Sequence, residues 1–131
     1  MNKQFAYPRE LRLLTPAHFQ QVFNQPPVKA VSKHLTLLAQ PNQLSHPRLG
    51  ITVSKRNAKL AVQRNQIKRI IRESFRLKQH KLTGFDIIVI AKPGVTELDK
   101  SALRDLSDYL WRKLSKRCKQ YVSDLSDSTS S

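Results

Sequence analysis

The hydrophobic positions along the chain change their spacing several times, and each spacing predicts one kind of element. Between Thr15 and Phe23 the apolar residues fall on one helical face, with a Thr-Pro start and the pair Pro26-Pro27 as a stop. Segments 34–40 and 48–55 alternate between apolar and other side chains, as strands do. The turn-rich residues 41–47 between these two segments predict a hairpin connection.

The second half of the chain has a longer helical spacing and then a nearly unbroken apolar run. Residues from about 59 to 82 predict a helix, and residues 85–91 predict a central strand covered on both faces. After a turn at Pro93-Gly94, Asp99 is placed to cap a last helix. The buried stripe expected on that helix consists of Leu103, Leu106, Leu110 and Leu114.

These elements follow the order α-β-β-α-β-α, with room for one additional short strand. This order indicates an α+β fold, built as a small sandwich of helices and sheet. A chain of 131 residues has the length of one compact domain. We expect a single domain over residues 1–122 and a polar, disordered tail over residues 123–131.

The stretch QRNQIKRIIRESFR, residues 63–76, separates its charged and apolar side chains onto opposite sides of a helix. At about 100° per residue, one arc carries Arg64, Asn65, Lys68, Arg69, Arg72 and Arg76. The opposite side carries Ile67, Ile70, Ile71, Ser74 and Leu77, with Phe75 at its border. We therefore expect one face of this helix to lie in a core and the other to be exposed and cationic.

The charge of the whole chain supports a polyanionic partner. Lys and Arg total 24 against 9 acidic residues, which gives a net charge of +15. The segment from Arg48 to Lys81 holds eleven of the cations and only one acid, Glu73. On the helix, successive cations four residues apart repel one another at a cost of a few tenths of a kcal/mol per pair. An external anion would remove that cost, whereas an ordinary solvated face would pair Glu with Lys or Arg.

Nucleic acid is the polyanion that these residues favour. A membrane-surface helix needs a large exposed apolar face, but the apolar face here is required by the sheet. Lys55, Arg56 and Lys59 extend the positive patch into the preceding loop, and arginine suits bidentate contacts with phosphates. Asn65 is able to hydrogen-bond a base edge or a sugar hydroxyl. RNA and DNA are not distinguished by composition.

Several other classes of protein are disfavoured. No run approaches the roughly 18 apolar residues of a spanning helix, and the N-terminus lacks the apolar run of a secretory signal. The one cysteine, Cys118, has no internal disulfide partner, which is typical of a reducing cytoplasm. A protein nuclease would need clustered carboxylates or paired histidines. The histidines at 18, 34, 46 and 80 are scattered over different elements and form no zinc or catalytic motif.

The residues of the cationic helix resemble the protein subunit of bacterial ribonuclease P. The pattern consists of Arg64-Asn65, Lys68-Arg69 and Arg72-Glu73 at fixed spacing. PRELRLLTPAHFQQVF, HPRLGITVSKRNAKLAVQ and DIIVIAKPGV match the flanking regions, so the resemblance covers roughly residues 5–119. It implies a small α/β sandwich whose βαβ unit has a left-handed crossover, an exception to the usual right-handed preference.

The resemblance also implies a function and its partners. The protein would bind a large catalytic RNA and assist it in removing the 5′ leader from precursor tRNA, with Mg²⁺ held at the RNA active site and no cofactor on the protein. By position, Arg64, Asn65, Lys68, Arg69 and Arg72 would contact the RNA, with Lys55 and Arg56 on the same surface. Glu73 would orient a neighbouring arginine or cap a local network rather than touch RNA directly.

A cleft for the leader is implied between the first helix and the sheet. Phe19 and Phe23 match its aromatic pair, although their spacing alone fits a buried core equally well. Leu38 aligns where some relatives carry an aromatic residue. The absence of that ring would weaken stacking on leader bases. Two rivals share the basic charge: a ribosomal-protein-like or RNA-chaperone module, and a self-sufficient ribonuclease.

Overall fold

The computed structural model describes the backbone of residues 26–129 and the side chains of residues 26–125. The expected first helix, with Phe19 and Phe23, lies outside the described residues. The described chain runs β1 (Val28–Val31), β2 (Leu35–Pro41), β3 (Arg48–Thr52), α2 (Ala61–Lys78), β4 (Phe85–Ala91) and α3 (Lys100–Thr129). Short 3₁₀ turns, η3 (Gln79–Lys81) and η4 (Val95–Glu97), follow α2 and β4. The additional short strand allowed by the sequence is β1.

The four strands form one mixed sheet in the order β1-β2-β4-β3. β2 is antiparallel to both β1 and β4, whereas β3 is parallel to β4. The hairpin expected between the second and third strands is therefore wrong, because β4 lies between them. β4 takes the inner position because it is apolar on both faces: Ile87 and Val89 point one way, Ile88 the other, and all three are fully buried.

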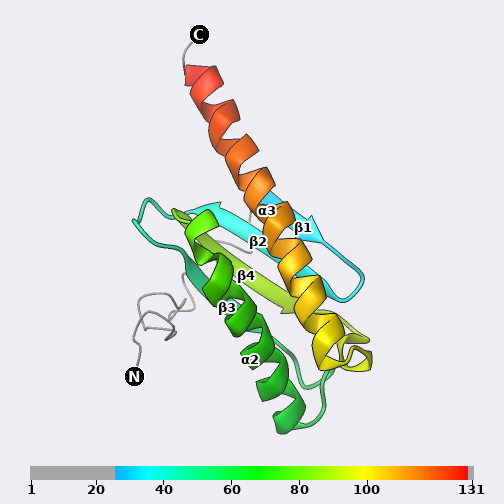
Figure 1. Cartoon of the computed structure of the whole chain (residues 1–131). Coiled ribbons are helices and arrows are strands. Elements are labelled where there is room, and N and C mark those ends of the chain that lie inside the picture. Colours follow the sequence, from blue (N-terminus) through cyan, green and yellow to red (C-terminus); the bar gives the residue numbers. More distant parts are fainter. Residues whose placement is uncertain (1–25, 130–131) are drawn as a thin grey trace, which may run out of the picture.

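Both described helices cover the same face of the sheet (Figure 1). β3, α2 and β4 form a parallel βαβ unit. Seen from the helix side with its two strands pointing upward, β4 lies to the left of β3, so the crossover is left-handed (Figure 1). This is the hand that the family resemblance implied and that the general preference would have reversed.

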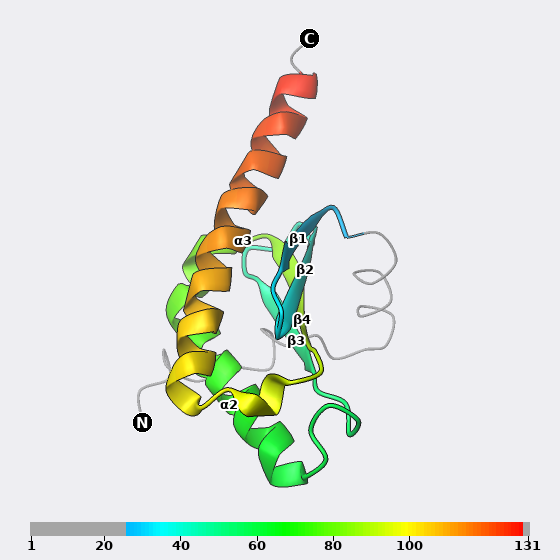
Figure 2. The ribbon, with the colours of Figure 1, turned by 90° about the vertical axis from the view of Figure 1, so that its right-hand side faces the viewer.

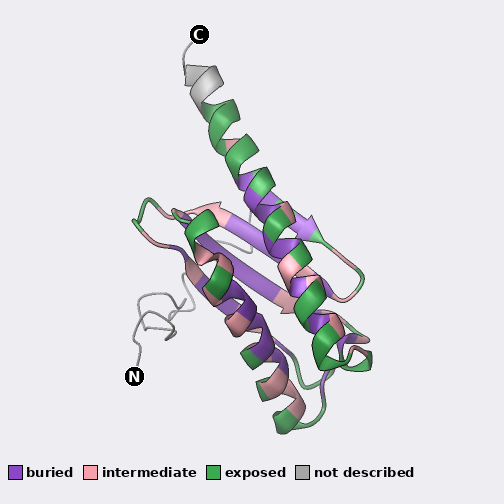
Figure 3. Ribbon diagram, viewed as in Figure 1, coloured by how far each residue is buried: buried purple, intermediate pink, exposed green. Residues whose placement is uncertain are grey.

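The main core lies between the two helices and this sheet face (Figure 3). Ile71 and Phe75 of α2 are 0% exposed, and Phe75 packs on Trp111 of α3 with their ring centroids 5.4 Å apart. The expected α3 stripe is buried at Leu103, Leu110 and Leu114, while Leu106 is partly buried. Trp111 and Cys118 complete it, and burial raises the pKa of the Cys118 thiol to about 12.

The buried face of α2 differs in one position from its expected face. Phe75, placed at the border by the helical wheel, is fully buried, whereas Leu77 is 59% exposed. The helix packs against both the sheet and Trp111, and this double contact centres the buried arc nearer Phe75 than Leu77. The hydroxyl of the buried Ser74 adds a polar link between the helices by donating to the Asp108 carboxylate of α3.

α3 extends well beyond the sheet toward the C-terminus (Figures 1 and 2). Residues 123–129, expected as a disordered tail, continue this helix. Once the packed part of α3 is formed, each further residue adds a backbone hydrogen bond without a new nucleation cost. The expected domain boundary at residue 122 stays a prediction.

Candidate nucleic-acid interface

The turn between β3 and the cationic helix α2, residues 54–58, is held in place by hydrogen bonds and is called the pinned turn below. In that turn the N–H groups of Asn57 and Ala58 donate to the Ser54 carbonyl at 3.2 and 3.0 Å. The side-chain amide of Asn57 also donates to the Ala91 carbonyl at 3.0 Å, which ties the turn to the end of β4. Lys55 and Arg56 lie exposed in this turn. Their charges are thus carried by a backbone that is fixed relative to the sheet.

Arg64 joins the same turn to the helix. Its Nη1 donates to the carbonyls of Ala58 and Lys59, both at 2.9 Å. The structure therefore gives Arg64 a structural role in addition to the RNA contact that the resemblance implies. The helical wheel places Arg64 only on the exposed, cationic face, and the two hydrogen bonds to the turn are not visible from that pattern.

Arg64→Ala is expected to lower the free energy of unfolding by about 1–2 kcal/mol, because two carbonyls lose a charged donor. Thermal and urea unfolding of the variant measure this loss. Asn65→Ala, on the exposed neighbouring residue, is the matched control and is expected to unfold like the unmodified chain. If the two variants were equally stable, the structural role of Arg64 would be contradicted.

The remaining pattern residues of α2 lie on its outer side. Lys68 and Arg72 are partly exposed, Asn65 is exposed, and the side chain of Arg69 is 79% exposed. Lys68 also lines a cavity of about 410 Å³ together with Thr52, Ser54, Asn57 and Ile90. This cavity brings the cationic helix, the pinned turn and the sheet edge at β3 to one place.

Glu73 is held between two arginines. Its carboxylate lies 3.8 Å from Nε of Arg69 on α2 and 3.6 Å from Nη2 of Arg104 on α3. The expectation that Glu73 orients a neighbouring arginine agrees with this geometry. Arg104, which the sequence did not single out, places a further exposed cation beside the α2 pattern.

The sheet face opposite the helices carries Leu38. Leu38 is 7% exposed and packs with Ile88 and Ile90 in a small cluster separate from the main core. The strand register places Gly50 beside Ile88 and Thr52 beside Ile90 on this face. The face is therefore apolar in its middle, with small or polar residues toward β3. The leader contact of Leu38 stays a prediction.

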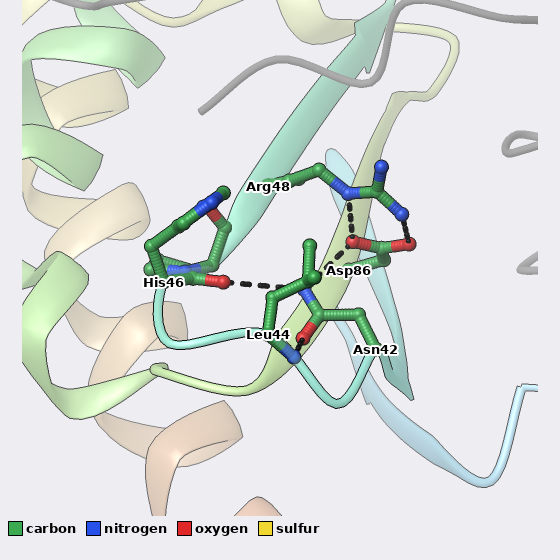
Figure 4. A network of polar contacts seen from close by, with 6 residues as sticks. Asn42, Leu44, His46, Arg48 and Asp86 are labelled. Carbon is green, nitrogen blue, oxygen red and sulfur yellow. Dashed lines mark hydrogen bonds and ion pairs between the residues drawn. The ribbon is translucent and has the colours of Figure 1, made fainter. Parts of the chain in front are cut away.

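One end of this sheet face holds a partly buried ion pair (Figure 4). Arg48 of β3 donates from Nε and Nη2 to the two carboxylate oxygens of Asp86 on β4, each at 2.7 Å. Asn42 donates to the same carboxylate at 2.9 Å and to the His46 carbonyl at 3.2 Å. The hydrogen bond from Arg48 to Asp86 raises the pKa of Arg48, desolvation opposes it, and the Asp86 charge adds to the rise.

This ion pair has two consequences for a polyanion. Among the described residues it neutralises the one buried acid of the face, Asp86, and through Asn42 it holds the connection between β2 and β3. In the sequence, Asp86 is only an acid at the start of the strand predicted over residues 85–91. No signal pointed to its partners, because Arg48 and Asp86 meet only through the parallel pairing of β3 with β4.

Two other kinds of feature, a metal-ligand cluster and a membrane-spanning helix, are absent from the described part of the chain. Within the described residues, no three His, Cys, Asp or Glu side chains are grouped so that they could hold a metal ion. The described helices include none that is both long and apolar enough to span a membrane. The histidines at 34, 46 and 80 lie in three different connecting segments, and His18 is outside the described part.

Comparisons with known proteins point to one family. The model of the family described as Ribonuclease P matches residues 7–115. A ribonuclease P protein component of Idiomarina loihiensis is 65% identical over 123 residues, which are 94% of this chain and 98% of that protein.

Solved structures agree with the sequence comparison. The Staphylococcus aureus RNase P protein matches 78% of this chain and 93% of its own, with 29% identity and a TM-score of 0.72. The Thermotoga maritima RNase P protein matches 77% and 96%, with 30% identity and a TM-score of 0.66. The mixed sheet with its helices is thus an arrangement that occurs in these proteins.

Proposed function

The chain belongs to the ribonuclease P protein family and serves tRNA processing as a protein component of ribonuclease P, and from this premise we propose how its surface acts. The outer side of α2, with Arg64, Asn65, Lys68, Arg69 and Arg72, binds phosphates and sugars of the catalytic RNA. Lys55 and Arg56 in the pinned turn extend the contact. This RNA is the partner that membership of the holoenzyme implies.

One observation supports this proposal above the others. The inner side of α2 is locked in the core by Ile71 and Phe75, both 0% exposed, so its cations are held at fixed spacing. Cations that are pre-positioned lose little freedom on binding, which favours affinity for a structured phosphate backbone. A flexible basic segment would have to order itself when RNA binds.

The sheet face opposite the helices is the proposed site for the 5′ leader. Leu38 and Ile88 offer apolar contact to unstacked bases, and Phe19 and Phe23 are proposed to stack on them. The cavity shared by Lys68, Thr52 and Ile90 would join this face to the α2 cations. A continuous RNA path from leader to catalytic RNA is supported by that connection. Leu38 lacks a ring, so we expect weaker stacking at its position.

Hydrolysis of the phosphodiester bond is proposed to belong to the RNA, which would hold the Mg²⁺ ions. Two acids near the proposed RNA surfaces are engaged with arginines: Glu73 with Arg69 and Arg104, and Asp86 with Arg48. Carboxylates paired in this way are poorly suited to hold a pair of metal ions. The protein would act by neutralising phosphates, in the cytoplasm where precursor tRNA is made.

The test compares precursor and mature tRNA in the presence of the catalytic RNA, with and without the protein. Protein is expected to tighten precursor binding by at least tenfold relative to mature tRNA, because only the precursor has a leader. It is also expected to lower the Mg²⁺ concentration at half-maximal cleavage, because its cations replace bound divalent ions.

Three outcomes would contradict the proposal. An RNA chaperone or ribosomal-protein-like module would improve precursor and mature tRNA binding equally. A self-sufficient ribonuclease would cleave precursor with RNA-free protein. An unchanged Mg²⁺ requirement would remove the role of phosphate neutralisation.

A further inference from the structure

A second cavity lies on the other side of α2, between its first half and the start of α3. Its volume is about 260 Å³. Ile67 and Ile70 of α2 and Leu103 of α3 form an apolar floor, together with Val95 and Leu98. The volume is slightly below the roughly 300–1,000 Å³ of sites that enclose small molecules. One flat ring system therefore fits it better than a larger ligand.

The rim of this cavity carries hydrogen-bonding groups. Gln63, Gln66, Thr96, Asp99 and Lys100 line it alongside the floor. Oε1 of Gln63 accepts from the Leu60 N–H at 3.2 Å, and Asp99 accepts from the Ala102 N–H at 2.7 Å. No hydrogen bond is found for the side chain of Gln66 within residues 26–125, so its amide offers both a donor and an acceptor at the cavity mouth.

Cations border the same opening. Lys100 lies on the rim, and Arg104 follows one turn later on α3. Arg69, one turn after Gln66 on α2, is 79% exposed and lies with Arg104 around Glu73. The cavity thus combines an apolar floor, a side-chain amide and nearby positive charge. A nucleobase attached to a phosphate chain has the complementary set: an apolar face, a polar edge and an adjacent anion.

We propose that this cavity binds one unstacked nucleobase of the RNA that lies along α2. The base would rest on Ile67, Ile70 and Leu103, and Gln66 would hydrogen-bond its edge. The backbone on either side would continue along the cationic face past Arg69. The inference rests on the proposed function, since it names a subsite for the same RNA. This subsite is separate from the proposed leader site on the opposite sheet face, because the cavity lies on the helix side of the sheet.

Mononucleotides test the site without the catalytic RNA. The full chain, with labelled amide and methyl groups, is titrated by NMR with adenosine 5′-monophosphate and, as a matched probe without a base, with ribose 5-phosphate. We expect the adenosine nucleotide to shift the Gln66 side-chain amide and the methyl groups of Ile67, Ile70 and Leu103. Ribose 5-phosphate is expected to leave them in place. Equal shifts with both probes, or shifts confined to the outer cations, would overturn the proposal.

The second arm measures affinity for the catalytic RNA. Gln66→Leu keeps the side-chain size and helical position but removes the hydrogen bonds, and is expected to weaken binding about tenfold. The slope of affinity against salt is expected to stay unchanged, because no phosphate contact is lost. Gln120→Leu, on the exposed side of α3, is the matched control and is expected to bind normally.

The two arms separate this inference from the function on which it rests. If Gln66→Leu bound RNA normally and circular dichroism showed the variant to be folded, the proposed base subsite would be contradicted. The proposed α2 interface would be unaffected by that result. If the unmodified chain failed to bind the catalytic RNA, the proposed function would fail. The mononucleotide titration would then still decide whether the cavity takes a base.

Discussion

Ile71→Ala is expected to lower the free energy of unfolding by about 2–5 kcal/mol, as burial of this side chain is complete. Ile71 lies where α2 packs on the sheet, and its removal leaves a cavity that surrounding side chains fill only partly. Urea unfolding at 25 °C measures the change. Leu77→Ala is the control on the same helix, and its 59% exposure predicts a change within about 0.5 kcal/mol.

Ile71→Ala should retain its affinity for RNA once the folded fraction of the variant is taken into account. Ile71 faces the core, so its loss removes no contact with phosphate. Binding is measured at a temperature at which unfolding curves show the variant to be folded. A large loss of affinity in fully folded Ile71→Ala would mean that the two sides of α2 are not separable.

The double variant Lys68→Gln with Arg72→Gln is expected to do the opposite of Ile71→Ala, because it should weaken RNA binding more than it affects folding. Its affinity for the catalytic RNA should fall on the order of 10- to 100-fold at low salt, because two phosphate contacts are lost. The slope of log affinity against log salt should fall by about 1–2 units. Both side chains lie on the outer, partly exposed side of α2, so their replacement opens no cavity in the core, and binding is compared at a temperature at which unfolding curves show the variant to be folded.

The control for this variant removes the same charge from another place. Lys116 and Lys119 are exposed on the part of α3 that lies beside β1, where Arg117 donates to the Lys29 carbonyl. Lys116→Gln with Lys119→Gln lowers the net charge equally, and its affinity is expected to fall less than threefold. If both double variants weakened binding equally, the net charge of +15 would explain RNA binding without a dedicated interface.

The predicted elements agree with the structure where local spacing governs them. The strand at residues 85–91 and the helix around residues 63–76 follow from apolar patterns that burial requires. The cap at Asp99 is likewise formed, with Ala102 as its donor. In each case the signal lies within one turn or one strand, so no distant partner is needed to interpret it.

Errors occurred where distant segments compete for the same position. The segments that became β2 and β3 looked like hairpin partners, but β4 separates them because it is apolar on both faces. Trp111 lies outside the stripe predicted for α3, yet it packs on Phe75 of another helix. Arg48 was counted among the basic residues, yet its guanidinium is paired with Asp86.

By itself the sequence determined the two-sided character of α2, because a helix of fixed pitch sorts its residues onto faces without help from other elements. It also determined the excess of positive charge, and its pattern residues indicated the family. Tertiary structure alone decided which protein groups each cation meets. Arg48 pairs with Asp86, Arg64 donates to a protein carbonyl, and Arg69 lies beside Glu73 with its side chain 79% exposed. The reason is physical: a cation's partners depend on which strands and turns lie within hydrogen-bonding distance, and chain order does not specify this.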